Sequence, residues 1–172
     1  MWPALDLKNL SGSWDSFEAA ALMVVKVHGT TSSGLASRFY RELRTQSKVR
    51  GNPTPRLTKV PDDEILTGLR KVGVANASKQ LSLGRPFETV KKATLVNLSG
   101  SVTRSVLNHG RRTLTESLVA DEKVNKVRAR MQRITSGSPC SWCAERAGVT
   151  YPANEDFSAH DHCSCYPSPV YL

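Results

Sequence analysis

The sequence contains no long apolar run. Its first predicted helix has one uncharged apolar stretch, residues 19–25, which ends at Lys26. A membrane-spanning helix needs about 20 apolar residues, so we expect no membrane anchor. Aromatic residues make up only 6% of the 172 residues and apolar residues 39%. That length can bury one ordinary core with a small added module. The composition suits a protein that completes its burial against other subunits, and ordinary helical proteins have the same composition.

The common catalytic motifs are also missing. The chain has no phosphate-binding loop, no dinucleotide-binding glycine pattern, no His-Glu-x-x-His motif and no Gly-x-Ser-x-Gly motif. His28 and His109 stand alone in predicted helices, where a structural histidine is more common than a catalytic base. We therefore predict that the protein is not an enzyme and takes no small-molecule substrate.

Residues 1–139 contain no cysteine, because all four cysteines lie in the last 33 residues together with two of the four histidines. Their spacing is C-x2-C, sixteen further residues, then H-x-H-C-x-C. Two thiolates two residues apart can reach one ion from a tight turn, and the second cluster can complete a tetrahedral shell. The pattern predicts one structural zinc ion per chain, with ligands drawn from Cys140, Cys143, His160, Cys163 and Cys165.

Six donors compete for four places, and the C-x2-C pair is the firm half. The other half is either His160 with Cys163, three residues apart, or Cys163 with Cys165, whose side chains share a face if the segment is extended. His162 is the weakest candidate, because a histidine beside another is more often an exposed or hydrogen-bonding side chain, and the histidine left over can orient a ligand.

Three other interpretations of the cysteines compete with zinc. A disulfide framework needs an oxidising compartment, and we expect none because residues 1–30 show no basic segment followed by an apolar run and a cleavage site. A redox Cys-x-x-Cys would begin a helix in a strand–helix–strand unit, a pattern not seen around Cys140. A catalytic cysteine would leave three cysteines unexplained.

The C-terminal residues resemble those of a known family. The likeness lies in Cys140-Ser-Trp-Cys-Ala, Val149-Thr-Tyr, Phe157-Ser-Ala-His-Asp-His-Cys-Ser-Cys and Pro169-Val-Tyr. These segments resemble the C-terminal signature of the minor capsid, or head morphogenesis, proteins of actinobacterial tailed phages, relatives of the Mu F-like group. A weaker likeness reaches upstream to Gly110-Arg111, Asp121, Phe39-Tyr40 and Arg44, and the run between Cys143 and Tyr151 is shorter than is usual in the family.

The resemblance implies a minor structural component of a phage head. Its partners would be the portal and other head proteins. Its location would be the virion, in the capsid interior or near the portal, with the host cytoplasm as the location before assembly. Because the run between Cys143 and Tyr151 is shorter than usual, we expect the contacts of this loop to differ from those in the family, although all the ligands remain.

Charge is unevenly distributed along the chain. Residues 1–139 hold 23 Lys and Arg against 11 Asp and Glu, a net +12, whereas residues 140–172 hold one Arg against four acids, a net −3. A basic body suggests contact with packaged DNA or an acidic surface, and a merely solvated basic surface explains it equally well. The alternative function is therefore a zinc-stabilised, sequence-nonspecific nucleic-acid-binding protein that uses Arg111, Arg112, Lys123, Lys126, Arg130 and Arg133.

The predicted fold class is mainly α, with a helical body over residues 1–134, a loop or linker near 46–60, and a zinc-binding C-terminal module over 135–172 that has a short β-hairpin as one option. Apolar spacing predicts a hairpin of two helices, 15–28 and one from Leu35, around a loop at 29–34. Arg38, Arg41 and Arg44 would lie on a solvated face.

Further along the chain, Pro61 and the acids at 62–64 predict a helix start. Residues 86–120 form one long helix or two abutting ones, with Gly100 and Gly110 as places of close approach. The basic run 121–133 is an amphipathic helix, or residues 130–134 form a strand that enters the metal module.

Overall fold

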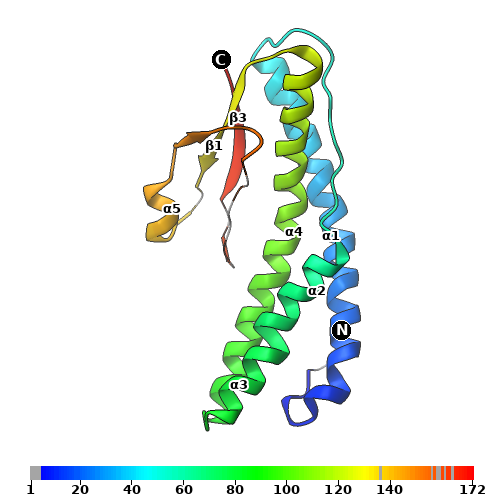
Figure 1. Cartoon of the computed structure of the whole chain (residues 1–172), viewed down its shortest axis with the longest axis vertical. Coiled ribbons are helices and arrows are strands. Elements are labelled where there is room, and N and C mark those ends of the chain that lie inside the picture. The colour runs from blue at the N-terminus through cyan, green and yellow to red at the C-terminus, as the bar shows by residue number, and fades with distance from the viewer. Residues whose placement is uncertain (1–4, 136, 156, 158–159, 161, 164) are drawn as a thin grey trace.

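Two long helices run side by side along most of the molecule (Figure 1). The computed structural model describes residues 5–135, 137–155, 157, 160, 162–163 and 165–172. Helix α1 spans Leu10–Gln46 and helix α4 spans Phe87–Asn125. At about 1.5 Å per residue each is roughly 55–60 Å long. A short 3-10 turn, η1 (Leu7–Asn9), precedes α1.

Helix α1 continues through residues 29–34, which we expected to form a loop. Gly29 lies so close to the ring of His109 on α4 that an added Cβ would stand 2.7 Å from it. Ser33 donates a hydrogen bond from Oγ to the carbonyl of Thr58 at 2.8 Å. Glycine, threonine and serine have weak helix propensity, so the segment is helical because these contacts stabilise it. The predicted hairpin of two helices is therefore wrong.

The segment after α1, residues 47–61, contains no helix or strand and lies along α4. The backbone N–H of Arg56 donates to Ser117 Oγ at 2.8 Å, and that of Thr58 donates to Thr113 Oγ1 at 3.1 Å. The linker expected at 46–60 is thus irregular, as its prolines require, but it is bound to α4.

Arg44 is buried, although the sequence placed it on a solvated face with Arg38 and Arg41. Its Nε and Nη2 donate to the carboxylate of Asp121 on α4 at 2.8 and 3.2 Å. The remaining donors of its guanidinium bind three backbone carbonyls of the following loop, those of Val49, Arg50 and Gly51. One side chain therefore joins the end of α1, the loop and α4.

A second helical layer follows the loop. Helix α2 (Asp62–Arg70) begins directly after Pro61 with three acids in its first turn, as predicted. It continues as a π-helical stretch, η2 (Lys71–Ala75), and then as α3 (Asn76–Ser82). Gly73 in η2 faces the ring of Trp14 on α1, where an added Cβ would stand 2.5 Å from the ring. The chain then turns at Gly84, which has a φ of +73°.

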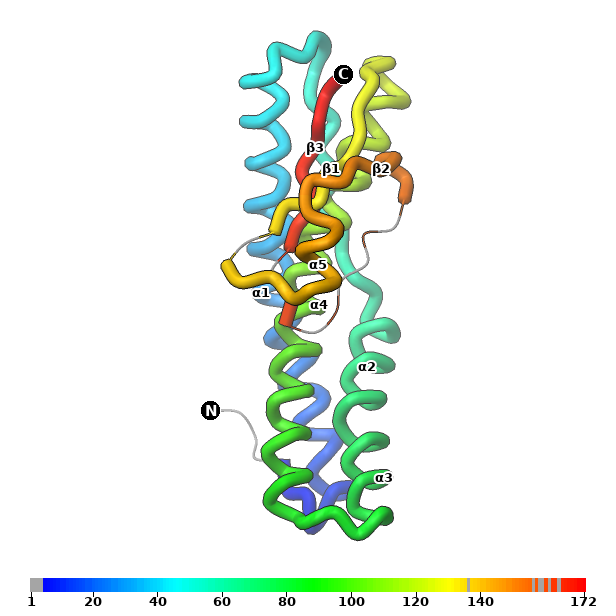
Figure 2. The backbone as a smooth tube through the Cα atoms, turned by 90° about the vertical axis from the view of Figure 1, so that its left-hand side faces the viewer, coloured from blue at the N-terminus to red at the C-terminus, as the bar shows by residue number. Residues whose placement is uncertain are grey.

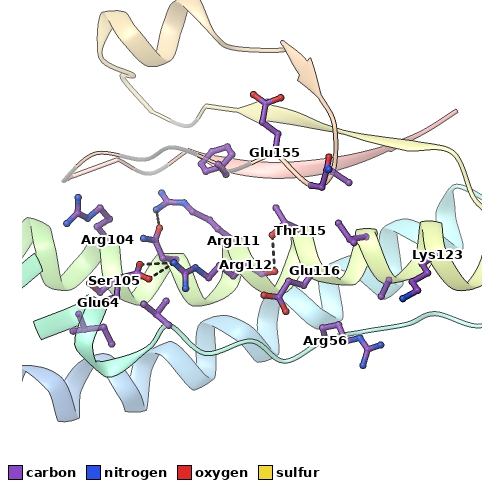
Figure 3. A pocket seen from close by; sticks show the side chains of 18 residues that line it. Arg56, Glu64, Arg104, Ser105, Arg111, Arg112, Thr115, Glu116, Lys123 and Glu155 are labelled. Atoms are coloured by element: carbon purple, nitrogen blue, oxygen red, sulfur yellow. Dashed lines mark hydrogen bonds and ion pairs between the residues drawn. The ribbon is translucent and has the colours of Figure 1, made fainter. Parts of the chain in front are cut away.

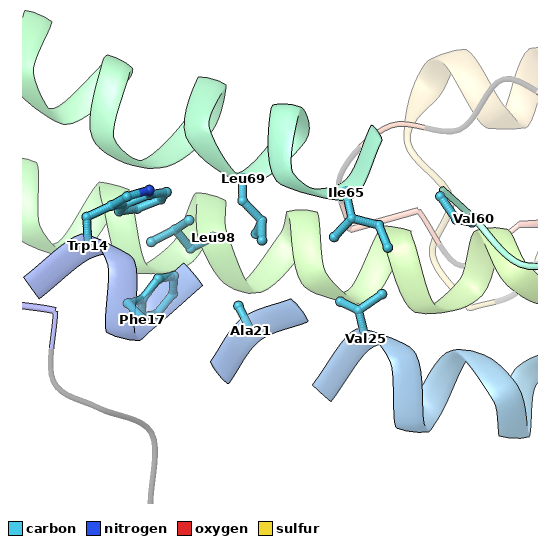
Figure 4. Close-up of a cluster of buried hydrophobic side chains, with 8 residues drawn as sticks. All are labelled: Trp14, Phe17, Ala21, Val25, Val60, Ile65, Leu69 and Leu98. Carbon is cyan, nitrogen blue, oxygen red and sulfur yellow. The ribbon is translucent and has the colours of Figure 1, made fainter. Parts of the chain in front are cut away.

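The largest apolar core lies where α1, α2 and α4 meet (Figure 4). Helix α1 contributes an apolar stripe at helical spacing, and α2 contributes Ile65 and Leu69. Leu69 is fully buried and Ile65 is 1% exposed. The stripe matches the apolar positions expected for amphipathic helices. The buried members of this core are Trp14, Phe17, Ala21, Val25, Val60, Ile65, Leu69 and Leu98.

The long stretch after Pro86 forms the single helix α4, one of the two options that the sequence left open. Both glycines inside it permit close approach, as expected. A Cβ on Gly110 would lie 2.7 Å from Ser32 Oγ on α1, and a Cβ on Gly100 would lie 2.5 Å from the ring of His162. The glycines therefore let α1 and the C-terminal module approach α4.

A three-stranded antiparallel sheet follows α4, in the order β2-β1-β3. Helix α4 ends at Asn125 because Lys126 takes a left-handed conformation with φ 55°. Strand β1 (Ala129–Ile134) lies between β2 (Thr150–Tyr151) and β3 (Tyr166–Tyr171). The strand option for residues 130–134 is therefore correct, and a helix that runs to Arg133 is wrong.

The sheet lies beside α4 (Figure 2). Burial alternates along β1, so that Ala129 and Met131 face a second core with Tyr40 and Leu118. Pro169 pairs with Met131 in the edge strand β3, a position where a proline is tolerated because one side of the strand needs no donor. Since β1 pairs with β3, the sheet joins residues on both sides of the boundary expected at 134, and the division into two domains stays a prediction.

The fold is mainly α with a small C-terminal sheet beside a cysteine–histidine cluster, as predicted. Among the helices in the described part of the chain, none has both the length and the apolar character needed to cross a bilayer.

Candidate metal centre

A short helix, α5 (Ser141–Glu145), positions the first two cysteines. Cys140 precedes it in extended backbone, and its carbonyl accepts the N–H of Ala144 at 2.9 Å. Cys143 follows within the same turn. Cys140 is exposed, whereas Cys143 is 1% exposed. The two-residue spacing thus places one thiol at the surface and the other inside.

A turn followed by β3 positions the other donors. The backbone N–H of Cys163 donates to the carbonyl of His160 at 3.1 Å, and His162 has a φ of 61°. A left-handed residue reverses the chain within a few positions, which lets His160 and Cys163 face the same point. Cys165 directly precedes β3, so the sheet holds this arm in place.

The distances between donor atoms match the edges of a tetrahedral metal site. Zinc–sulfur bonds of about 2.3 Å and zinc–nitrogen bonds of about 2.0 Å give tetrahedral edges of roughly 3.8 Å between two sulfurs and roughly 3.5 Å between sulfur and nitrogen. Cys143 Sγ lies 3.8 Å from Cys163 Sγ and 3.5 Å from His160 Nε2. Cys140 Sγ lies 3.0 Å from His160 Nε2, which is closer than such an edge. Cys140, Cys143 and His160 are therefore close enough to share one ion, and Cys143 is equally close to the second arm.

The structure brings the five predicted donors together in two groups that overlap at Cys143. In each group the donor atoms lie within 4.8 Å of one another, so these groups can hold a metal ion. His162 belongs to neither group, since its ring lies against Gly100. The first group is Cys140, Cys143 and His160, and the second is Cys143, Cys163 and Cys165.

Hydrogen bonds and burial shift the thiol pKa values in opposite directions. The backbone N–H of Cys143 and the ring of His160 lower the pKa of Cys140 to about 7. Burial raises the pKa of Cys143 to about 12, and the neighbouring thiols add to this effect. For Cys163, burial raises the pKa, but hydrogen bonds from Cys165 outweigh it and the net shift is downward. A divalent cation favours thiolates at such a site and displaces their protons.

Arg111 connects α4 to the segment that carries Cys163 and Cys165. Its Nη2 donates to the carbonyls of Cys163 and Cys165 at 2.7 and 2.8 Å, and its Nε donates to the Cys165 carbonyl at 3.0 Å. Nη1 donates to Asn108 Oδ1 at 2.8 Å. Burial lowers the pKa of this guanidinium. No sequence pattern marks this role of Arg111, because its partners are backbone carbonyls, which every residue has.

Aromatic rings and further arginines surround the cluster. The guanidinium of Arg133 lies 4.1 Å from the centre of the Phe157 ring and 4.8 Å from that of Trp142. Arg146 lies 4.3 Å from the centre of the Trp142 ring. Such cation–π contacts cover the apolar surface beside the metal donors and are each worth about 0.5–2 kcal/mol.

The burial of Arg111 and Arg133 argues against their role in nucleic-acid binding, which stays a prediction. Arg111 is 4% exposed and Arg133 is 6% exposed, so little of either side chain is open to a phosphate backbone. Their charge faces the cluster, which the sequence did not show. Arg112 is paired with Glu64 at 2.6 Å. Of the six basic residues, Lys123 and Lys126 are exposed, and Arg130 is partly buried.

An open cleft of about 1000 Å³ lies between α4, the segment after residue 55 and the C-terminal module. Arg111 extends from α4 on the side of the C-terminal strands, whereas Arg112 meets Glu64 (Figure 3). Glu116 accepts a hydrogen bond from Thr58 at 2.8 Å. Both signs of charge therefore line the cleft, and it lacks the uniformly positive wall that favours a nucleic-acid backbone.

A family model described as VG15 protein matches residues 1–171, and thus covers both the helices and the metal centre. A search of curated proteins and a search of solved structures each find no match. The family agrees with the viral character that the C-terminal resemblance implies, whereas the minor-capsid role and the Mu F-like grouping stay predictions. The chain belongs to the VG15 protein family, a family of viral proteins.

Proposed function

We propose that the protein is a minor structural component of a tailed-phage head that is assembled near the portal, and that it is not an enzyme. The observation that carries the proposal is the cluster of five metal donors fastened to the middle of a long helical rod. A metal-clamped module offers a rigid docking surface at a size where an apolar core is insufficient. The C-terminal resemblance to minor head proteins supports the same role.

Zinc is the metal that these donors suit best. Thiolates and an imidazole in tetrahedral spacing favour zinc over magnesium or calcium, which prefer oxygen ligands. Five donors are more than four positions require, so a bound zinc ion would have no open position for a substrate. This surplus supports a structural ion, one per chain, and not a catalytic one.

The shape of the molecule supports a role in assembly. It exposes 10089 Å² of surface, whereas a compact monomer of 18.9 kDa exposes about 8300 Å². The outer faces of α1 and α4 expose large apolar side chains. Met23 on α1 is 67% exposed, and Val96 on α4 is 50% exposed. Portal and other head proteins would cover part of this surface.

Nucleic-acid binding is the second candidate, and the exposed Lys123 and Lys126 are what still favours it. Any such binding would be weak, independent of sequence and strongly dependent on salt, because it would rest on phosphate contacts alone. With Arg111 and Arg133 buried and Arg112 paired, few of the predicted contacts remain.

The test removes the metal site in a virus that encodes this chain. Cys143→Ser combined with Cys163→Ser should block or misdirect head formation, as seen by electron microscopy and by mass spectrometry of purified particles. Ser141→Ala, a change in the same short helix that removes no donor, is the control and should give normal heads. Heads with normal DNA content and infectivity in the double variant would contradict the proposal. The same holds if the intact protein is never found in virions or procapsids.

A further inference from the structure

The Arg111 guanidinium is buried beside the metal donors, and no carboxylate among the described residues is bonded to it. Within the part of the chain that the structure describes, its polar partners are the carbonyls of Cys163 and Cys165 and the side-chain oxygen of Asn108. None of these groups carries a formal charge. A buried cation is costly unless a negative charge lies nearby. The partners of Arg111 therefore satisfy its hydrogen bonds but not its charge.

Thiolates of the cluster can supply the negative charge that is missing among the hydrogen-bond partners of Arg111. The carbonyls that it binds belong to Cys163 and Cys165, so its guanidinium lies beside both residues. When these thiols are deprotonated, their charge attracts the guanidinium. The face of the Phe157 ring, 5.5 Å from Arg111, offers only partial negative charge.

The formal charge of a zinc site depends on how many thiolates it contains. With two thiolates and two neutral histidines a zinc site has no net charge, with three thiolates it has −1, and with four it has −2. Only the thiolate-rich sets leave a negative charge for Arg111 to balance. The group of donors that adjoins Arg111, which is Cys143, Cys163 and Cys165, alone contains three thiolates.

We infer that Arg111 is the positioning residue of this metal centre: its guanidinium holds the Cys163–Cys165 arm against α4, and its charge balances a zinc site that contains at least three thiolates. The role depends on the metal proposed above, but not on where the protein is assembled. A guanidinium is suited to it, because it presents several donors in a planar fork, whereas a lysine has one compact ammonium group.

The experiment measures the zinc affinity of the full chain by competition with a chromogenic chelator. Arg111→Met should weaken zinc binding by about 10- to 100-fold, the effect typical of losing a group that orients metal ligands. Arg111→Lys, which keeps the charge but not the fork, should lie between Arg111→Met and the wild type. Arg112→Met is the matched control, since the neighbouring arginine pairs with Glu64, and it should leave zinc affinity unchanged.

Two readouts separate this role from simple packing. Cobalt in place of zinc should give thiolate charge-transfer absorption of the same intensity in Arg111→Met as in the wild type, because the ligands are unchanged. In the wild type, the Nε–H proton of Arg111 should be protected from solvent exchange with zinc and lose that protection when zinc is removed. If Arg111→Met does not fold, Asn108→Ala loosens the same guanidinium and should weaken zinc binding in the same direction.

Three results would overturn the inference and leave the metal centre in place. The first is wild-type zinc affinity in Arg111→Met or, if that variant does not fold, in Asn108→Ala. The second is an equal loss of affinity in Arg112→Met. The third is a cobalt spectrum with fewer than three thiolates. A wild-type chain that holds no zinc would contradict both this inference and the metal centre itself. Normal zinc binding that does not depend on Arg111 would contradict only the role of Arg111.

Discussion

Three arginines are buried in the described part of the chain, and two of them, Arg44 and Arg111, have different kinds of partner. Arg44 forms an ion pair with Asp121, and each side chain also binds neighbouring groups of the loop or of α4. Arg111 binds neutral carbonyls beside thiols that become negatively charged on binding a metal. The stability that the Arg44–Asp121 pair provides should therefore depend on pH, whereas the surroundings of Arg111 should change when a chelator removes the metal.

Asp121 should make stability fall in acid. Burial raises its pKa, but hydrogen bonds from Arg44 and Asn125 outweigh burial and hold the pKa below its ordinary value. Because the folded-state pKa is the lower one, the stabilisation is fully present above pH about 4 and is lost as the pH falls through the folded-state value. Asp121→Asn should cost about 3–5 kcal/mol at neutral pH, since it leaves Arg44 unpaired.

Urea unfolding between pH 6 and pH 3 measures this difference. The free energy of unfolding should fall more steeply below about pH 4 in the wild type than in Asp121→Asn. Glu122→Gln, a change at the next residue, is the control and should keep the wild-type slope. Equal slopes in the wild type and Asp121→Asn would show that Asp121 does not carry the acid sensitivity.

At the scale of elements, helix α1 depends on α4 in its middle third. Residues 29–34 contain two glycines, two threonines and two serines, a composition that would not form an isolated helix. Gly29 and Gly34 occupy opposite environments in this segment. Gly29 is buried against His109, whereas a Cβ on Gly34 would meet nothing within 4 Å. The two glycines thus serve different purposes in one helix.

Alanine at these two positions should change stability in opposite directions. Gly34→Ala should stabilise the protein by about 0.5–1 kcal/mol, because alanine favours a helix and the space is free. Gly29→Ala should destabilise it by about 1–3 kcal/mol, because the new methyl group overpacks a buried ring. Chemical denaturation of the two variants measures both effects. A change of the same sign in both would mean that the contact with His109 does not decide the helix.

At the scale of the whole molecule, the helical rod and the C-terminal module have different sources of stability. The rod has an apolar core shared by α1, α2 and α4. The buried cluster of the module contains Phe157 and three of the cysteines, and Tyr151 packs against it. So small a cluster supplies little hydrophobic stabilisation. The module should therefore depend on the metal far more than the rod does.

Removing zinc should unfold the C-terminal module and leave most of the helix intact. Structural zinc contributes on the order of 10 kcal/mol of apparent folding free energy, and the rod keeps its own core. Hydrogen exchange should show lost protection over 140–165, while far-ultraviolet circular dichroism falls only slightly. Cys143→Ser should behave like chelation, and Ser138→Ala should not. Full protection without metal, or loss of the helices together with the module, would contradict this.

Features that depend on near neighbours along the chain could be predicted before the structure. Pro61 and three acids predict the start of α2, and the apolar spacing after Pro86 predicts α4. Both signals are local, because residues three and four apart lie on the same face of a helix. The five candidate metal donors were also predictable, since the spacing of the cysteines and histidines is typical of metal ligands.

Features that depend on partners far away in the chain could not be predicted, because only the folded structure brings those partners together. Residues 29–34 are helical because His109 and Thr58 pack on them, and Arg44 is buried because Asp121 lies 77 residues away. Arg111 reaches carbonyls 52 and 54 residues further along the chain. Every residue has such a carbonyl, so no pattern in the chain distinguishes the two that Arg111 binds. The fold alone brings them to its guanidinium, and this buries beside a candidate metal site an arginine that the sequence offered only for weak phosphate contact.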